Sequence, residues 1–236
     1  MAVGTGTLWV LDFDGTLYRG GLARFAGGIS NADLFVHLLF APGSWARRWR
    51  FLRAGWGIAR LNGLASRGES DAVCIEAFRS LLRREFRADE IWRAGEGMTG
   101  GLDGRALAVL GRWLQPDDRV MVLSKAFLPV LIPAGVRLSA VFGRGVEVVG
   151  NRLEEEGGIL RVADKERELR AILADLSAER AVVVGDTEEE LGLREVLAEA
   201  GIPARLLAVN PKDERLVKAA DVVLPSWRQA ESPPFA

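Results

Sequence analysis

The sequence predicts an α/β protein whose core is a doubly wound parallel sheet, with a helical segment inserted after the first strand. Two observations lead to this prediction. Short apolar runs alternate with helical patterns along the C-terminal half, as they do in βαβ units. An isolated apolar run near the N-terminus is followed by a long stretch with a helical pattern instead. The 236 residues are enough for one large domain or two modest ones.

The predicted strands are short and nearly continuous in their apolar character. The first, Thr7–Leu11, suits a strand that is buried on both faces of a parallel sheet. Four later runs follow the same pattern: Arg119–Leu123, Ala181–Val184, Ala204–Val209 and Asp221–Leu224. Helical patterns at Lys165–Leu176 and Glu188–Ala200 separate some of these runs. Residues 146–162 contain two β-like pieces around a Glu-Gly-Gly turn, which predict a hairpin near the sheet edge.

The stretch from residue 22 to residue 115 predicts a helical insertion between the first strand and the others. Its helical segments lie near Asn31–Phe40, Ser44–Leu61, Ser70–Phe86 and Gly104–Leu114. Residues 34–68 hold six arginines and no acidic residue: Arg47, Arg48, Arg50, Arg53, Arg60 and Arg67. An apolar stripe of three tryptophans and one leucine accompanies them: Trp45, Trp49, Leu52 and Trp56. Two interpretations are open for this arginine- and tryptophan-rich face. The apolar stripe packs on other helices of the insertion or on a dimer partner, with the arginines in solvent, or the face contacts an anionic membrane surface or a lipid phosphate.

Composition excludes several classes of protein. The 32 acidic and 31 basic side chains nearly balance, so no nucleic-acid partner is expected from overall charge. The single cysteine, Cys74, cannot form an intrachain disulfide, and no secretory or membrane-spanning segment is recognised, so a cytoplasmic location is expected. With one histidine, His37, multi-histidine metal sites are excluded, and no G-x-x-x-x-G-K-[ST] phosphate loop occurs.

The most informative motif is Asp-Phe-Asp-Gly-Thr-Leu at residues 12–17, directly after the first predicted strand. Open α/β sheets bind their ligands at this end of the strands. Alternation along the chain places Asp12 and Asp14 on the same side, and two carboxylates so close require a divalent cation or a shared proton. Gly15 permits a sharp turn that presents backbone N–H groups to an anion. The alternative, a strand end with an ordinary Asp-Gly turn, does not account for the whole motif.

Three further features follow later predicted strands or begin helices. Ser124 follows one strand, Lys165 begins a helix, and the acidic motif Gly-Asp-Thr-Glu-Glu-Glu at 185–190 follows another strand. Each has a purely structural alternative: a helix cap, a solvated surface cation, and carboxylates that complement a helix dipole. Lysine is scarce in this chain, which has only four: Lys125, Lys165, Lys212 and Lys218. That scarcity favours a specific role for Lys165.

These four features, in this order, resemble the motifs of the haloacid dehalogenase (HAD) superfamily of phosphohydrolases. The resemblance covers the whole chain and implies a Rossmann-like catalytic core of residues 1–20 and 116–236. Residues 21–115 would then form the family's inserted helical cap. Residues 148–160 further resemble a hairpin of the phosphoserine phosphatase-like branch.

The resemblance also implies a role for each site residue. Asp12 matches the nucleophile that forms an aspartyl-phosphate, and Asp14 matches the general acid and base. Ser124, Lys165 and Gly15 would bind the phosphoryl group. Asp12, Asp14 through its carbonyl, and Asp186 would bind Mg²⁺. The sequence departs from the family pattern at Glu190, where Asp is usual, and this side chain would hold a metal-bound water or orient Lys165.

The implied activity is Mg²⁺-dependent hydrolysis of a small soluble or lipid-linked phosphomonoester. An Asp two residues after the nucleophile favours phosphoester chemistry over the dehalogenase and phosphonatase branches of the superfamily. Two alternatives remain open: a mutase that transfers the phosphoryl group to a sugar hydroxyl, and a non-catalytic protein that binds a partner through the basic cap. The sequence determines neither the substrate nor the oligomeric state.

Overall fold

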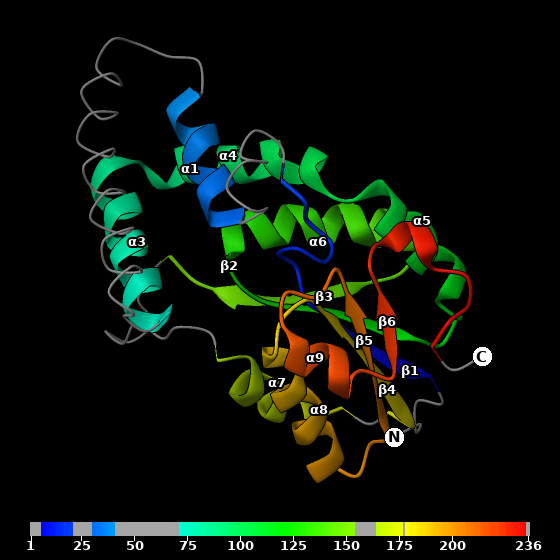
Figure 1. Ribbon diagram of the computed structural model, residues 1–236. Helices are drawn as coiled ribbons and strands as arrows, with labels where there is room; N and C mark the ends of the chain where they lie inside the picture. Colours follow the sequence, from blue (N-terminus) through cyan, green and yellow to red (C-terminus); the bar gives the residue numbers. More distant parts are fainter. Residues whose placement is uncertain (1–5, 21–29, 41–70, 154–163, 177, 235–236) are drawn as a thin grey trace.

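A computed structural model describes residues 6–20, 30–40, 71–153, 164–176 and 178–234. Its centre is a parallel sheet of six strands in the order β3-β2-β1-β4-β5-β6. The strands are β1 (Thr7–Leu11), β2 (Arg119–Phe127), β3 (Val146–Asn151), β4 (Arg180–Gly185), β5 (Ala204–Val209) and β6 (Val222–Leu224). β1 therefore lies in the middle of the sheet although it is separated from β2 by more than a hundred residues (Figure 1). The predicted doubly wound α/β fold is confirmed.

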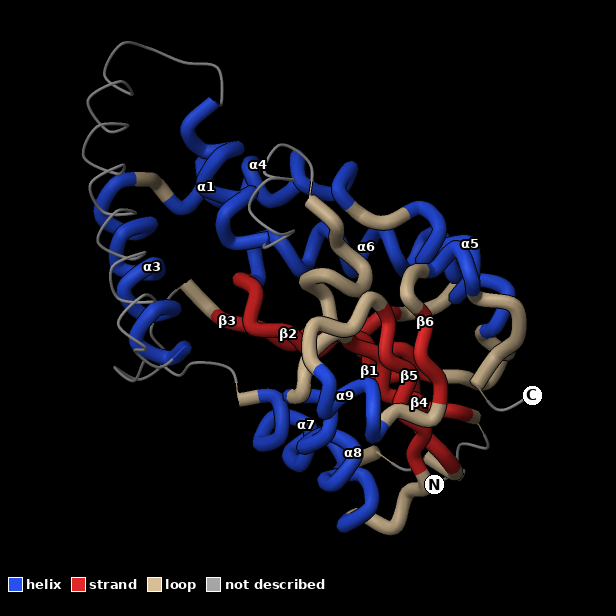
Figure 2. The backbone as a smooth tube through the Cα atoms, viewed as in Figure 1, coloured by secondary structure: helices blue, strands red, loops and turns tan. Residues whose placement is uncertain are grey.

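Helices cover both faces of this sheet (Figure 2). One face carries α7 (Lys165–Leu173), α8 (Glu189–Glu199) and α9 (Glu214–Ala219). The other carries α5 (Gly104–Trp113) and α6 (Leu128–Phe142). Beyond α6 lie α1 (Ser30–Phe40), α4 (Ala88–Gly97) and the short η2 (Met98–Gly101), whereas α3 (Asp71–Glu85) lies past the ends of β2 and β3. The last 3₁₀ turn, η3 (Trp227–Gln229), packs beside α5.

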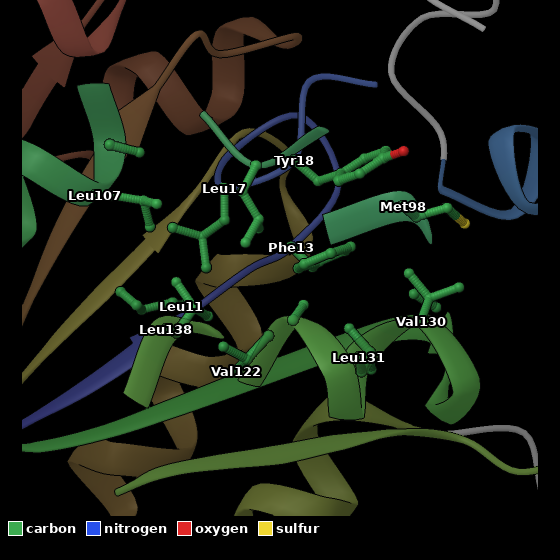
Figure 3. Close-up of a cluster of buried hydrophobic side chains, with 14 of the residues drawn as sticks. Leu11, Phe13, Leu17, Tyr18, Met98, Leu107, Val122, Val130, Leu131 and Leu138 are labelled. Carbon is green, nitrogen blue, oxygen red and sulfur yellow. The ribbon is translucent and has the colours of Figure 1, made fainter. Parts of the chain in front are cut away.

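Alternating side chains of β1 divide between two hydrophobic clusters. Leu8 and Val10 belong to the cluster beneath α7, α8 and α9, and Trp9 and Leu11 belong to the cluster on the opposite face. This alternation follows from the two-residue period of a strand, and it explains why the run is apolar at every position from Leu8 to Leu11. Figure 3 shows the second cluster continuing beyond the strand, where Phe13, Leu17 and Tyr18 lie above α6.

The inserted segment shares this second cluster. α4 packs against α6, and α1 packs against α4. Trp113 of α5 packs between Trp9 of β1 and Trp227 of η3, with ring centroids 6.4 and 6.2 Å apart. The segment between β1 and β2 is therefore continuous with the core through buried apolar contacts. The division into a core and a cap at residues 20 and 115 stays a prediction.

Two predicted elements differ from the structure. β2 extends to Phe127, four residues beyond the predicted end, and its pairing with β3 is irregular between Leu123 and Phe127. The first half of the predicted hairpin is β3, which lies at the sheet edge but pairs in parallel with β2. Residues 154–163, which include the second half, lie outside the described residues, so the resemblance to the phosphoserine phosphatase-like hairpin stays a prediction.

The arginine- and tryptophan-rich face of the insertion also lies outside the described residues, because residues 41–70 contain it. The alternatives of membrane contact, partner contact and internal packing therefore stay open. Among the helices that the structure does describe, none combines the length and the apolar character needed to cross a membrane.

Candidate active site

The predicted site residues gather at the carboxyl end of the three central strands. Leu11 of β1 pairs with Val122 of β2 and with Val184 of β4. The residues that follow each of these positions therefore emerge together at one edge of the sheet, as they do in other open parallel sheets. In this way the register brings together the first motif, Ser124 and the acidic motif, which are far apart in the sequence.

Lys165 is the centre of a buried ionic cluster. Its Nζ donates to Asp12 Oδ1 at 2.7 Å and to Glu190 Oε1 at 2.9 Å, and it lies 3.4 Å from Glu189 Oε2. Lys165 is the first residue of α7, whose N-cap Asp164 accepts a hydrogen bond from the backbone N–H of Arg167. The lysine therefore projects from a capped helix start, and the alternative of a solvated surface cation is wrong.

Burial and charge shift the ionisation of this cluster. Although burial alone lowers the pKa of Lys165, the charges of Asp12, Glu190 and Glu189 raise it well above its usual value. Burial raises the pKa of Asp12, and Lys165 opposes that rise. Burial likewise raises the pKa of Glu190, again opposed by Lys165. The charged form of Lys165 is thus favoured beside the predicted nucleophile.

Asp14 is held by the first residue of α1. Ser30 donates its backbone N–H to Asp14 Oδ1 at 2.7 Å and its hydroxyl to Asp14 Oδ2 at 3.0 Å. Burial and the negative charge of Asp12 raise the pKa of Asp14 to about 7, and the hydrogen bonds from Ser30 act in the opposite direction. A carboxyl group with a pKa in this range can both give and take a proton near neutral pH.

Asp186 faces the turn of the first motif. Its Oδ2 lies 2.7 Å from the Nζ of Lys212, in the loop after β5. Gly15 has a φ of +81°, and a Cβ atom at this position would come within 1.8 Å of Asp186 Oδ2. Only glycine permits this close approach, so Gly15 brings the turn and the acidic motif together. Burial raises the pKa of Asp186, and the Lys212 ammonium lowers it.

Ser124 lies inside β2, at the irregular part of that strand, and is buried. Its hydroxyl oxygen accepts from the backbone N–H of Ala126 at 3.1 Å. The helix that follows begins at Leu128 with Phe127 as its N-cap, so the alternative that Ser124 caps this helix is wrong. Irregular strand positions commonly re-aim side chains next to active sites.

A family model of haloacid dehalogenase-like hydrolases matches residues 9–189, which is most of the chain. The match contains the first motif, Ser124, Lys165 and residues 185–189 of the acidic motif. The chain belongs to the haloacid dehalogenase-like hydrolases. The predicted family and the prediction that the protein is an enzyme are thereby confirmed. None of the curated proteins compared with this sequence matches it.

Solved structures similar to this HAD hydrolase share its fold at low sequence identity. Cytosolic 5'-nucleotidase IIIB bound to cytidine is 16% identical, with a TM-score of 0.54 over 86% of this chain and 72% of that one. YfnB from Bacillus subtilis, bound to magnesium, is 14% identical, with a TM-score of 0.51 over 95% and 96%. A phosphoserine phosphohydrolase-like protein from Francisella tularensis subsp. tularensis SCHU S4 is 12% identical, with a TM-score of 0.51 over 93% and 95%.

The carboxylates of Asp12 and Asp186 in this HAD hydrolase are oxygen donors of the kind that bind a divalent cation. Asp12 and Asp186 are buried, and their negative charges repel, so that Asp186 raises the pKa of Asp12. Asp186 Oδ2 is buried and, apart from the Lys212 ammonium at 2.7 Å, has no hydrogen-bond partner among the described residues. A hard cation would offset this repulsion. Within the described part of the chain no three His, Cys, Asp or Glu side chains form a metal cluster, so backbone or water oxygens would complete the coordination.

Several residues near the site were not predicted from the sequence. Ser30 contacts Asp14, Lys212 contacts Asp186, and Lys125 forms an ion pair with Glu189. Lys212 could have been found, because it is one of four lysines and follows a predicted strand near its carboxyl end. Ser30 carries no comparable signal in the sequence.

Proposed function

We propose that this HAD hydrolase is a Mg²⁺-dependent phosphatase that hydrolyses a small phosphomonoester through an aspartyl-phosphate on Asp12. The observation that carries this proposal is the contact of the Lys165 ammonium with Asp12 at 2.7 Å. A carboxylate attacks an anionic phosphate only where positive charge offsets the repulsion, and a buried ammonium supplies that charge. The magnesium in YfnB and the nucleotidase fold neighbour support the same chemistry.

In the first half of the reaction, a carboxylate oxygen of Asp12 attacks phosphorus and the ester P–O bond breaks. Asp14 gives its proton to the departing alcohol oxygen, which leaves as a neutral alcohol. Lys165 and Ser124 would bind the phosphoryl oxygens, with backbone N–H groups of the turn at Gly15. A bound Mg²⁺, held by Asp12, Asp186 and the carbonyl of Asp14, would supply further positive charge.

In the second half, water attacks phosphorus of the aspartyl-phosphate and the bond between phosphorus and the Asp12 oxygen breaks. Asp14, now ionised, takes a proton from that water, and inorganic phosphate leaves. Glu190 contacts the same Lys165 ammonium as Asp12 and is fully buried. We assign Glu190 to the orientation of Lys165 rather than to direct contact with the substrate.

The test is phosphate release from an aryl phosphate with and without Mg²⁺, together with mass spectrometry of the acid-quenched enzyme. We expect turnover that requires Mg²⁺ and a gain of one phosphoryl group on the peptide that contains Asp12. Asp12→Asn should abolish both signals, whereas the matched control Asp175→Asn, at an exposed position, should leave them unchanged. Turnover at the wild-type rate in Asp12→Asn would remove Asp12 as the nucleophile.

The substrate is addressed by a screen of phosphorylated metabolites that includes phosphoserine, sugar phosphates, nucleotides and lipid phosphates. Release of inorganic phosphate in proportion to substrate consumed supports a hydrolase. Isomerised sugar phosphate with little free phosphate would instead indicate a mutase, and no phosphoenzyme with any compound would support a non-catalytic role.

A further inference from the structure

A second lysine, Lys212, contacts the acidic motif and is distinct from Lys165, which contacts the predicted nucleophile. Lys212 Nζ lies 2.7 Å from Asp186 Oδ2, and the backbone N–H of Lys212 donates to the backbone carbonyl of Asp186 at 2.8 Å. The preceding Asn210 has a φ of 52°, which turns the chain sharply after β5. The loop is therefore anchored to the acidic motif by its backbone, independently of the lysine side chain.

The two lysines differ in burial and in their partners. The side chain of Lys165 is 7% exposed and contacts three carboxylates, whereas the side chain of Lys212 is 48% exposed. Among the described residues, Asp186 is the one carboxylate that the Lys212 ammonium contacts. The ammonium of Lys212 can therefore turn from Asp186 into solvent and stay hydrated. The ammonium of Lys165 is buried and has no such route to solvent.

The oxygen that Lys212 contacts is the one that faces the first motif. A Cβ atom on Gly15 would lie 1.8 Å from Asp186 Oδ2 and 3.1 Å from Lys212 Nζ. Asp186 itself is 1% exposed, so its charge needs a nearby cation in every state of the enzyme. An ammonium and a divalent cation cannot both approach this single oxygen closely, because their charges repel.

We propose that Lys212 is an internal counter-ion of Asp186 that a divalent cation displaces when it binds. This inference rests on the proposed function, because it takes Asp186 as a ligand of Mg²⁺. In the metal-free enzyme the Lys212 ammonium neutralises the buried carboxylate of Asp186 and so keeps this side chain in place. On metal binding its ammonium moves into solvent or toward the phosphoryl group of the substrate. The cost of that displacement weakens the affinity of the enzyme for Mg²⁺.

The first test measures the reactivity of lysine amines in the wild-type enzyme. The protein is labelled briefly with an amine-acylating reagent at increasing Mg²⁺ concentrations, and each lysine is quantified by mass spectrometry. We expect labelling of Lys212 to rise severalfold with Mg²⁺. Lys218 is an internal control, because it is 77% exposed and pairs with Glu214 on α9, and its labelling should stay constant. A constant or falling signal at Lys212 while Mg²⁺ binds overturns the inference.

The second test measures metal affinity directly, by calorimetry with Mg²⁺ and by electron paramagnetic resonance with Mn²⁺. Lys212→Met should lower the Kd about five- to tenfold, the order expected for loss of one competing, half-exposed ion pair. Lys125→Met is the matched control, because it removes a charge that pairs with Glu189 at the rim of the same site. Equal tightening in both variants would show a general effect of charge and would overturn the displacement of Lys212.

Failure of the inference and failure of the proposed function give different results. If the wild-type enzyme binds Mg²⁺ but neither Lys212 signal changes, the inference alone is wrong. If neither metal binds in any variant, the metal role of Asp186 is wrong, and both proposals fail. The labelling experiment uses unmodified protein, so it remains decisive if Lys212→Met does not fold.

Discussion

Glu190 provides a sharp test of the ionic cluster, because its side chain is fully buried and every polar contact is defined. Its Oε1 accepts from Lys165 Nζ at 2.9 Å, and its Oε2 accepts from the backbone N–H and the hydroxyl of Thr187 at 3.0 and 3.1 Å. The side chain also packs against Gly185, where a Cβ atom would lie 2.3 Å from Glu190 Cδ. The substitution Glu190→Ala removes all of these contacts at once.

The expected cost of Glu190→Ala follows from these contacts. Breaking a buried ion pair by removing one partner typically costs about 3–5 kcal/mol. One effect reduces this cost, because Asp12 and Glu190 repel each other and the repulsion raises the pKa of Glu190. We therefore expect a loss of about 3 kcal/mol in the free energy of unfolding, or about 10 °C in Tm for a chain of this size.

Glu190→Gln separates charge from shape. Glutamine keeps the volume beside Gly185 and one carbonyl oxygen that can accept from Thr187 or Lys165. It also removes the repulsion with Asp12, so we expect a loss of only about 1 kcal/mol. Glu188→Ala is the surface control, since Glu188 is exposed and pairs with Arg215 at 3.2 Å, and exposed pairs contribute about 0–1 kcal/mol.

The assay is urea unfolding followed by tryptophan fluorescence and far-ultraviolet circular dichroism, with coincident transitions as the test of two-state behaviour. The expected order of stability is wild type, then Glu188→Ala and Glu190→Gln, then Glu190→Ala. If Glu190→Ala costs less than about 1 kcal/mol, the buried contact with Lys165 does not stabilise the fold, and the reasoning from burial is refuted.

Three further predictions concern activity. Asp14→Asn should slow phosphoenzyme formation and breakdown by about 10²–10⁴-fold, with a smaller effect on formation for aryl phosphates than for alkyl phosphates in single-turnover kinetics; equal losses would argue against Asp14 as the acid. Lys165→Arg should keep part of the steady-state activity and Lys165→Met almost none, because the charge is required, and full activity in the Met variant would exclude Lys165 from the site. Gly15→Ala should reduce kcat at least about tenfold by displacing Asp186. The control is Gly143→Ala, because Gly143 also has a positive φ, of +65°, but has open space around a Cβ atom. This control should lose about 1 kcal/mol in urea unfolding and keep its kcat. Unchanged kcat in Gly15→Ala would show that the close approach to Asp186 is not needed.

The sequence by itself was enough to predict the fold class and to single out four residues of the candidate site. Parallel strands buried on both faces require continuous apolar runs, and such runs are visible without any alignment. Asp12, Asp14, Lys165 and Asp186 follow strands or begin helices, and the topology of an open α/β sheet places such positions at one edge. The family resemblance then gave each residue a role, and the match over residues 9–189 confirms the family.

Element ends and local pairings were predicted less well. β2 extends beyond Leu123 because its pairing with β3 resumes at Phe127 after an irregularity, and a parallel edge strand resembles half a hairpin in sequence. Both depend on which strand lies alongside, and that is decided by tertiary contacts rather than by the apolar pattern.

Only the tertiary structure decided which charges pair. Ser30 and Asp14 are 16 residues apart, Lys212 and Asp186 are 26 apart, and Lys165 and Asp12 are 153 apart. A hydrogen bond or ion pair is a contact of about 3 Å, far shorter than the precision with which periodicity places an element. The sequence therefore identified residues with the required chemistry, whereas the packing of α1, α7 and the loop after β5 against the sheet edge determined which carboxylate each of them meets.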